Sequence, residues 1–142
     1  MIWHPIFKRQ MISLEKVQRR ATKIIPELKD LPYIERLKKL NLPSLEYRQL
    51  RGDLLQTFKI IHDIDNIDKN EFFSMSDNET RNKNLKLFKH FAKTKVRYNF
   101  LPFRINNIWN SLHTNTRNSK DVLTFKKNID IELCHLKYKY SE

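Results

Sequence analysis

Apolar residues recur every three or four positions in five stretches of the chain, the spacing that places them on one face of an α-helix. The five stretches are residues 13–25, 32–40, 44–64, 102–112 and 120–136. Proline lies at or beside several of their ends, where a helix tolerates or requires a break: Pro26, Pro32, Pro43 and Pro102. The pattern therefore predicts a mainly α fold of about five helices.

The first predicted helix has two unlike faces. Its apolar stripe consists of Leu14, Val17, Ala21, Ile25 and Leu28. On the opposite face lie four basic residues, Lys16, Arg19, Arg20 and Lys23. Because an amphipathic helix normally buries its apolar stripe, we expect the stripe to pack either on this domain or on a missing partner, with the basic residues on the opposite face. Ser13 is the predicted N-cap.

Residues 85–100 carry no helical stripe. Apolar and basic residues alternate there instead, as in Leu85-Lys86-Leu87 and Lys95-Val96-Arg97-Tyr98. Alternation over short runs is typical of strands, so the sequence predicts a small β-hairpin over residues 85–100 with its bend near residues 92–94.

The length and the 39% hydrophobic content of the 142 residues favour a single module with a modest core. Within residues 1–142 the expected order is a helical part (12–64), an acidic and polar loop (65–84), the basic hairpin followed by two helices (85–136), and a frayed tail (137–142).

Basic charge is concentrated in one block. Residues 80–120 contain ten Lys or Arg and no Asp or Glu, so +10 of the net charge of +12 lies there. Such a concentration is typical of proteins that bind a polyanion, and nucleic acid is the commonest one. The candidate nucleic-acid-binding residues are Lys16, Arg19, Arg20, Lys23, Lys86, Lys89, Lys93, Lys95, Arg97 and Arg104.

Two interpretations of these residues stay open at this point. In the first, the basic side chains hold phosphates, and aromatic residues such as Phe88, Phe91 and Tyr98 stack on unpaired bases. In the second, the charges form a solvated face without a ligand and the aromatic residues belong to the core. The first predicts binding that weakens steeply with salt and depends little on sequence.

The residue types that catalysis needs are sparse or wrongly spaced. The chain has one glycine, Gly52, and one cysteine, Cys134, which excludes a glycine-rich phosphate loop and a cysteine-paired zinc site. The acidic stretch 63–68 resembles the start of a calcium loop, but its sixth position is not Gly and its twelfth, Ser74, is not Glu. We therefore expect no enzyme activity, no metal and no cofactor.

The same features predict an intracellular protein that is not inserted in a membrane. A single cysteine cannot form an internal disulfide, which is usual in a reducing compartment. The start of the chain lacks the basic and apolar regions of a signal peptide. No apolar stretch approaches the roughly 20 residues that span a bilayer.

Several short motifs occur in a characteristic order. They are Leu14-Glu15-Lys16-Val17-Gln18-Arg19-Arg20-Ala21-Thr22-Lys23, Glu35-Arg36-Leu37, Arg51-Gly52-Asp53-Leu54, Trp109-Asn110-Ser111-Leu112 and Phe125-Lys126. Together they resemble the region downstream of the polymerase core in LINE-type, jockey-like non-LTR retrotransposon reverse transcriptases. The resemblance spans roughly residues 3–133, and residues 14–23 are its most specific part. Two loop positions depart from the family pattern: residues 82–84 lack its glycine, and His113 replaces its proline.

The resemblance implies a parent enzyme that is an RNA-directed DNA polymerase. The aspartates of the family's palm domain and its endonuclease domain have no counterpart in this chain. The resemblance therefore implies a nucleic-acid-binding C-terminal fragment without activity of its own. Its implied partner is template RNA, target DNA or their hybrid, and its implied location is the nucleus or cytoplasm. Two alternatives remain: a structural segment packed on the thumb of the parent reverse transcriptase, or an inactive genomic remnant.

Overall fold

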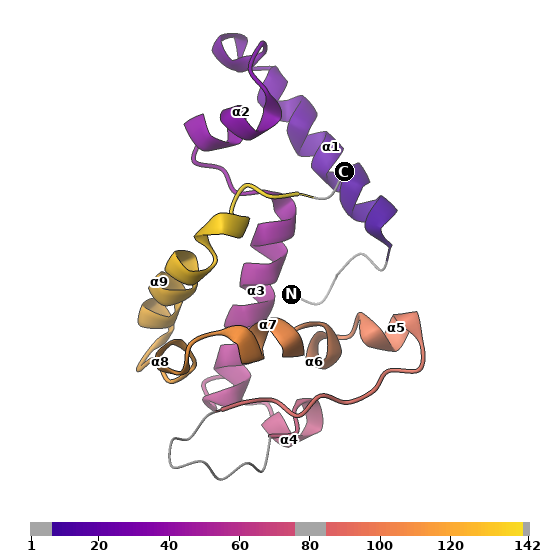
Figure 1. Cartoon of the computed structure of the whole chain (residues 1–142), viewed down its shortest axis with the longest axis vertical. Coiled ribbons are helices and arrows are strands. Elements are labelled where there is room, and N and C mark those ends of the chain that lie inside the picture. Colours follow the sequence, from indigo (N-terminus) through magenta and orange to yellow (C-terminus); the bar gives the residue numbers. More distant parts are fainter. Residues whose placement is uncertain (1–6, 76–84, 141–142) are drawn as a thin grey trace.

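The structure is a computed structural model that describes residues 7–75 and 85–140. It is mainly helical, which confirms the predicted fold class. The elements in chain order are α1 (Lys8–Lys23), η1 (Pro26–Leu28), α2 (Tyr33–Lys39), α3 (Leu45–Ile61), α4 (Lys69–Phe72), α5 (Lys95–Tyr98), α6 (Leu101–Arg104), α7 (Asn106–Ser111), α8 (Thr114–Arg117), α9 (Val122–Glu132) and η2 (Cys134–Leu136) (Figure 1). In these ranges no helix is both long and apolar enough to cross a membrane.

Helix α3 is the central element, and α1 and α2 lie at one of its ends while α4 lies at the other (Figure 1). Its predicted start is confirmed, because the Ser44 side chain accepts a hydrogen bond from the Tyr47 amide at 3.2 Å. Its predicted apolar stripe is confirmed as well and packs on α9, where the rings of Phe58 and Phe125 stack with centroids 4.2 Å apart. The buried core around this contact contains Tyr47, Leu54, Phe58, Ile60, Ile61, Phe73, Leu87, Ile105, Trp109, Leu112, Phe125, Ile129 and Leu133.

An ion pair also joins α3 to α9. Arg51 donates to both carboxylate oxygens of Asp130, at 2.7 and 2.9 Å, and the Tyr47 hydroxyl donates to the same group at 3.0 Å. The hydrogen bonds from Arg51 lower the pKa of Asp130 below its usual value. Burial, together with the bond to Asp130, raises the pKa of Tyr47 to about 12. Two charged groups and a phenol thus fix the register of the two helices.

The apolar stripe predicted for α1 is only partly buried, whereas its four basic residues are exposed on another face of the helix. The buried residues of α1 are Glu15 and Thr22, whereas Val17 of the predicted stripe is 66% exposed and the adjacent Ile24 is 80% exposed. The reason lies in what α1 packs against: α2 and the start of α3 present a hydroxyl, a guanidinium and free backbone amides, which polar side chains satisfy and apolar ones do not. Ser13 is not a cap, since it lies inside the helix and donates to the Arg9 carbonyl at 2.9 Å.

The predicted hairpin was wrong. Among the described residues the only β pairing is an isolated antiparallel bridge between Met75 and Leu87. Leu87 bonds instead to the Asn110 side chain, which accepts from its amide and donates to its carbonyl, both at 2.9 Å. Residues 95–98, for which the alternation predicts a strand, form α5, whose start is capped by the Thr94 hydroxyl. Side chains of α7 thus supply the hydrogen-bond partners that a neighbouring strand would supply to the backbone of Leu87.

Each of the two helices predicted after residue 100 is present as two shorter helical elements. The stretch 102–112 forms α6 and α7 around the buried Ile105. The Ile105 amide still bonds to the Leu101 carbonyl, and the Trp109 amide to the Ile105 carbonyl, so the chain keeps its helical course. The predicted loop 114–119 contains the short α8, and the last helix ends as α9 and η2 rather than as one helix.

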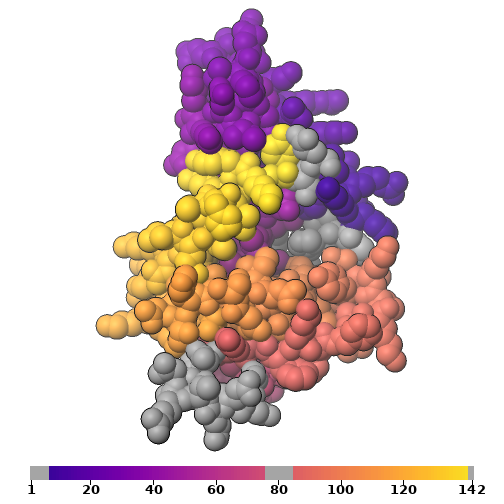
Figure 2. Space-filling model, in the orientation of Figure 1, coloured from indigo at the N-terminus to yellow at the C-terminus, as the bar shows by residue number. Residues whose placement is uncertain are grey.

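The tail (137–142), predicted to be frayed, is docked as far as the structure describes it. The Ser44 hydroxyl donates to the Lys139 carbonyl at 2.7 Å. The Tyr140 ring meets the Tyr33 ring edge-on, with centroids 5.2 Å apart. Figure 2 shows this yellow segment between the purple N-terminal elements and the orange ones. The tail therefore connects the start of the fold to its end.

Candidate functional site

Nine of the ten predicted binding residues are exposed, and in the described part of the chain none of the nine forms an ion pair. They form two sets. The α1 basic group consists of Lys16, Arg19, Arg20 and Lys23. The 86–97 basic group consists of Lys86, Lys89, Lys93, Lys95 and Arg97.

The α1 basic group lies beside a polar network that fixes the helix, and its Arg19 guanidinium lies over the Tyr33 ring, 5.7 Å from the centroid. Glu15, only 5% exposed, accepts from the Tyr33 hydroxyl at 2.6 Å and from the Leu45 amide at 2.9 Å. The second bond places its carboxylate at the N-terminus of α3, where the helix dipole favours negative charge. Burial and the bond to Glu15 raise the pKa of Tyr33.

Arg36 completes this network from α2. Its guanidinium is buried and donates to the Thr22 hydroxyl at 3.1 Å, to the Leu31 carbonyl at 2.6 Å and to the Arg19 carbonyl at 3.4 Å. The last bond reaches a carbonyl that also accepts from the Thr22 hydroxyl and lies toward the C-terminal end of α1, where a cation is favourable. The network explains why the face of α1 that carries the basic residues is turned to solvent.

The 86–97 basic group is held through its backbone. In addition to the Asn110 bonds to Leu87, the Trp109 indole donates to the Leu85 carbonyl at 2.7 Å. Asn106 donates to the Phe88 carbonyl at 2.8 Å. Leu87 is buried while its neighbours on both sides are exposed. Side chains of α7 therefore anchor the segment and leave its basic residues outward.

Arg104 has a different place from the other nine. It donates to both oxygens of Asp53, at 2.7 and 2.8 Å, and to the Asn99 carbonyl. The two charged side chains are 12% and 4% exposed. Arg104 thus fastens α6 to α3, and we leave it out of the candidate surface.

Two further features reduce the charge that the basic block presents. Arg117 is 2% exposed and donates to the carbonyls of Asn110 and Leu112, which close α7, and burial lowers its pKa. Arg81 and Lys83 lie outside the described residues. The surface charge of residues 80–120 that the structure describes therefore comes mainly from the 86–97 basic group.

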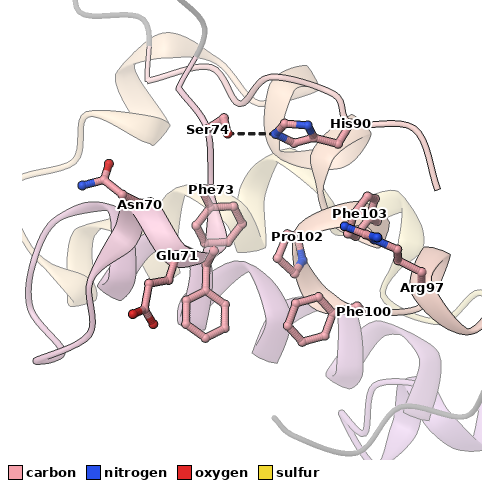
Figure 3. A pocket seen from close by; sticks show the side chains of 10 residues that line it. Asn70, Glu71, Phe73, Ser74, His90, Arg97, Phe100, Pro102 and Phe103 are labelled. Atoms are coloured by element: carbon pink, nitrogen blue, oxygen red, sulfur yellow. Dashed lines mark hydrogen bonds between the residues drawn. The ribbon is translucent and has the colours of Figure 1, made fainter.

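A pocket beside the 86–97 basic group was not foreseen from the sequence. It has a volume of about 290 Å³, close to the lower end of the range for small-ligand pockets, roughly 300 Å³. Its lining residues are Asn70, Glu71, Phe72, Phe73, Ser74, His90, Arg97, Phe100, Pro102 and Phe103 (Figure 3). We call it the aromatic pocket.

The walls of the aromatic pocket come from two parts of the chain. Phe72 of α4 faces Phe100, with ring centroids 6.1 Å apart and planes at 30°. Arg97 lies over the Phe103 ring at 5.4 Å from its centroid. His90 closes one end through a 2.8 Å hydrogen bond to the Ser74 hydroxyl (Figure 3). In the sequence these residues form two separate phenylalanine clusters, at 72–73 and at 100–103, and their spacing does not indicate that the clusters meet.

The acidic side chains of residues 63–68 bind nearby groups of the same chain. Asp63 pairs with Lys69 at 2.7 Å, and Asp65 accepts from Gln56 at 2.8 Å. Asp68 caps α4 by accepting from the Asn70 amide at 2.9 Å. In residues 7–75 and 85–140, no three His, Cys, Asp or Glu side chains gather as a metal site would require.

Comparison with known proteins yields no family model that matches the chain, and no match among curated proteins or solved structures. Function is therefore argued from the geometry of the chain itself.

Proposed function

We propose that this chain is a nucleic-acid-binding module without catalytic activity of its own. In keeping with the motif resemblance, it is the C-terminal module of a non-LTR retrotransposon RNA-directed DNA polymerase. Its partner is template RNA, target DNA or their hybrid, which places it in the nucleus or cytoplasm. The observation that carries the proposal is the exposure of nine basic side chains that form no ion pair within the described residues.

The mechanism is electrostatic. Each Lys or Arg that neutralises a phosphate releases condensed counterions, so affinity arises without base contacts and falls as salt rises. The α1 basic group belongs to a helix packed on the start of α3, and the 86–97 basic group lies near its end (Figure 1). Helix α3 has 17 residues and is about 25 Å long. A ligand that meets both groups must therefore extend over several nucleotides.

The test is fluorescence anisotropy of labelled single-stranded RNA, duplex DNA and RNA–DNA hybrid over a salt series. The unchanged protein should bind all three at low salt and lose affinity linearly on logarithmic axes. Lys89→Ala with Lys93→Ala should reduce the slope by about 2, roughly one unit for each phosphate that is no longer neutralised. Binding that stays flat across the salt series contradicts the proposal.

A charge-matched control separates the local surface from net charge. Lys120→Ala with Lys127→Ala removes the same charge from exposed positions outside both basic groups. We expect its slope to stay close to that of the unchanged protein. If the two double variants behave alike, only the overall charge of the protein matters and the basic groups are not a site.

A second candidate function is a structural segment that packs on the thumb of the parent reverse transcriptase. The exposed Val17 and Ile24 of the α1 region favour it, because large apolar side chains in solvent often mark an interface. An isolated chain of this kind should bind an apolar dye and melt with low cooperativity. Val17→Ser with Ile24→Ser should abolish the dye binding, whereas a cooperative melt of a monomer contradicts this candidate.

A further inference from the structure

We propose that the aromatic pocket receives one unpaired base of a single-stranded nucleic acid. This inference rests on the proposed function and sharpens it, because it selects single strands over duplexes. The shared chemistry is a flat heteroaromatic ring, which an exposed strand or a free nucleotide can supply. We assign the ring to a strand, since the pocket adjoins the 86–97 basic group and a basic side chain of that group lines it.

The pocket offers a flat ring an aromatic wall. Its volume is about 290 Å³. Phe72 and Phe100 pack on each other, with ring centroids 6.1 Å apart and planes 30° from parallel, so a base stacks on a free ring face rather than between the two rings. Phe100 is 52% exposed and therefore has such a face. Stacking of this kind is tolerant of base identity because every base has a π-face.

The charges at the pocket separate a base from its phosphate. Glu71 and Arg97 lie on opposite sides of the pocket, and the Glu71 carboxylate points away from its rings (Figure 3). A carboxylate repels phosphate, so the Glu71 side of the pocket disfavours the backbone of a strand. Arg97 lies over Phe103 and has no ion-pair partner in the part of the chain that is described, so its guanidinium is available to a phosphate. This arrangement places the base inside and the backbone at the rim.

Duplex nucleic acid cannot use this pocket without breaking a pair. In a duplex both faces of each base are covered by neighbours, and extruding one costs unpairing and unstacking energy. The basic groups bind duplex and single strand alike through phosphates. The pocket therefore adds affinity for single strands only. The difference between single-strand and duplex affinity thus measures the contribution of the pocket separately from that of the basic groups.

The experiment measures affinity by anisotropy for a single strand, a strand of equal length with abasic sites, a duplex, and a free mononucleotide as competitor. We expect the intact strand to bind at least about five-fold more tightly than the abasic strand, the low end of the effect of one stacked base. Phe100→Leu, which keeps an apolar side chain but removes the ring, should abolish that difference and leave duplex binding unchanged.

Two further variants test whether the effect belongs to the pocket. Phe7→Leu is the matched control, because Phe7 is 50% exposed and lies outside the pocket lining, and it should keep the full preference for the intact strand. Arg97→Lys keeps the charge but loses the flat group over Phe103, and it should weaken single-strand binding more than duplex binding. Circular dichroism of each variant confirms that the fold is retained.

The outcomes distinguish this inference from the proposed function. Equal affinity for intact and abasic strands, together with salt-sensitive duplex binding, overturns the base pocket and leaves the electrostatic module standing. A free mononucleotide that competes as well as the strand overturns the assignment to a strand. Absence of binding to every nucleic acid by the folded protein overturns both proposals.

Discussion

Glu15 is a buried carboxylate whose partners are a phenol and a backbone amide. It is 5% exposed and lies 2.6 Å from the Tyr33 hydroxyl and 2.9 Å from the Leu45 amide. No Lys or Arg of the described ranges forms an ion pair with it. Its charge is stabilised by hydrogen bonds and by the start of α3, so a polar residue performs the role that the apolar stripe was expected to have.

Replacement of Glu15 should therefore destabilise the protein. Glu15→Ala leaves the Tyr33 hydroxyl and the Leu45 amide without partners, and we expect unfolding in urea to show a loss of about 2–3 kcal/mol. Lys16→Ala, at the exposed neighbouring position, should change the unfolding free energy by less than about 0.5 kcal/mol. Similar values for the two variants would contradict the structural role of Glu15.

Tyr47 makes a pH-dependent contribution to stability. Its pKa is raised from 10.0 to about 12 in the folded protein. Because the folded state holds the phenolic proton more tightly than the unfolded state, the contribution is complete below pH 10 and is lost as the pH rises toward about 12. Tyr47→Phe should flatten this alkaline loss, as measured by urea unfolding at successive pH values.

The same variant has a second expected effect at neutral pH. Tyr47→Phe removes the hydroxyl that donates to Asp130, so we expect a loss of about 1 kcal/mol there. A variant that loses stability at neutral pH but keeps the full alkaline decline would show that another group titrates.

At the scale of elements, periodicity succeeded where apolar side chains make the contact. Leu54 and Phe58 of α3, and Phe125 of α9, lie in the main core, and their spacing predicted both helices. It also predicted the helix α1, but not which face of α1 is buried, because the buried residues there are Glu15 and Thr22 and a helical pattern of polar residues looks like a solvated face. Local sequence does not reveal that a distant hydroxyl or guanidinium will meet them.

The strand prediction for residues 85–98 failed for a related reason. The backbone partners of residues 85–88 are side chains of α7, which follow about twenty positions later in the chain, and residues 95–98 form the short helix α5. The aromatic pocket was missed in the same way, since Phe72 and Phe100 belong to separate clusters that only the fold unites. The basic residues were predictable because exposure is the ordinary state of Lys and Arg, and Arg104 was the exception because Asp53 is buried beside it.

Asn110 should be essential to the segment it anchors. Asn110→Ala removes both bonds to the Leu87 backbone, and we expect a loss of about 1–2 kcal/mol in urea unfolding. Hydrogen exchange at the Leu87 amide should accelerate. Asn110→Asp keeps the acceptor and loses the donor, so its exchange should be intermediate; unchanged protection in Asn110→Ala would show that the surrounding core alone holds the segment.

At the scale of the whole molecule, the tail joins the N-terminal elements to the rest of the fold, in addition to the hydrogen bonds between α1 and the start of α3. The N-terminal elements bury Leu28, Tyr33 and Leu37, which do not belong to the main core. Tyr140 packs on Tyr33, and the Ser44 hydroxyl bonds to the Lys139 carbonyl. We therefore expect these long-range interactions of the tail to couple the unfolding of the N-terminal elements to that of the main core.

Truncation after Leu136 should uncouple the parts. Removing the docked tail leaves the Ser44 hydroxyl without its acceptor and exposes Tyr33, so amides of α2 should exchange faster. The fluorescence of Trp109, recorded with Trp3→Phe, should keep its unfolding midpoint because that ring lies in the main core. Parallel loss of both signals would contradict a separable N-terminal part.

The anchoring of residues 85–88 by α7 has an evolutionary consequence. Asn106, Trp109 and Asn110 bind backbone atoms, which every residue type shares, and only Leu87 is buried between them. Mutations that change the outward side chains of this segment therefore leave its course intact. Selection can therefore exchange those side chains freely while the backbone of the segment keeps its position.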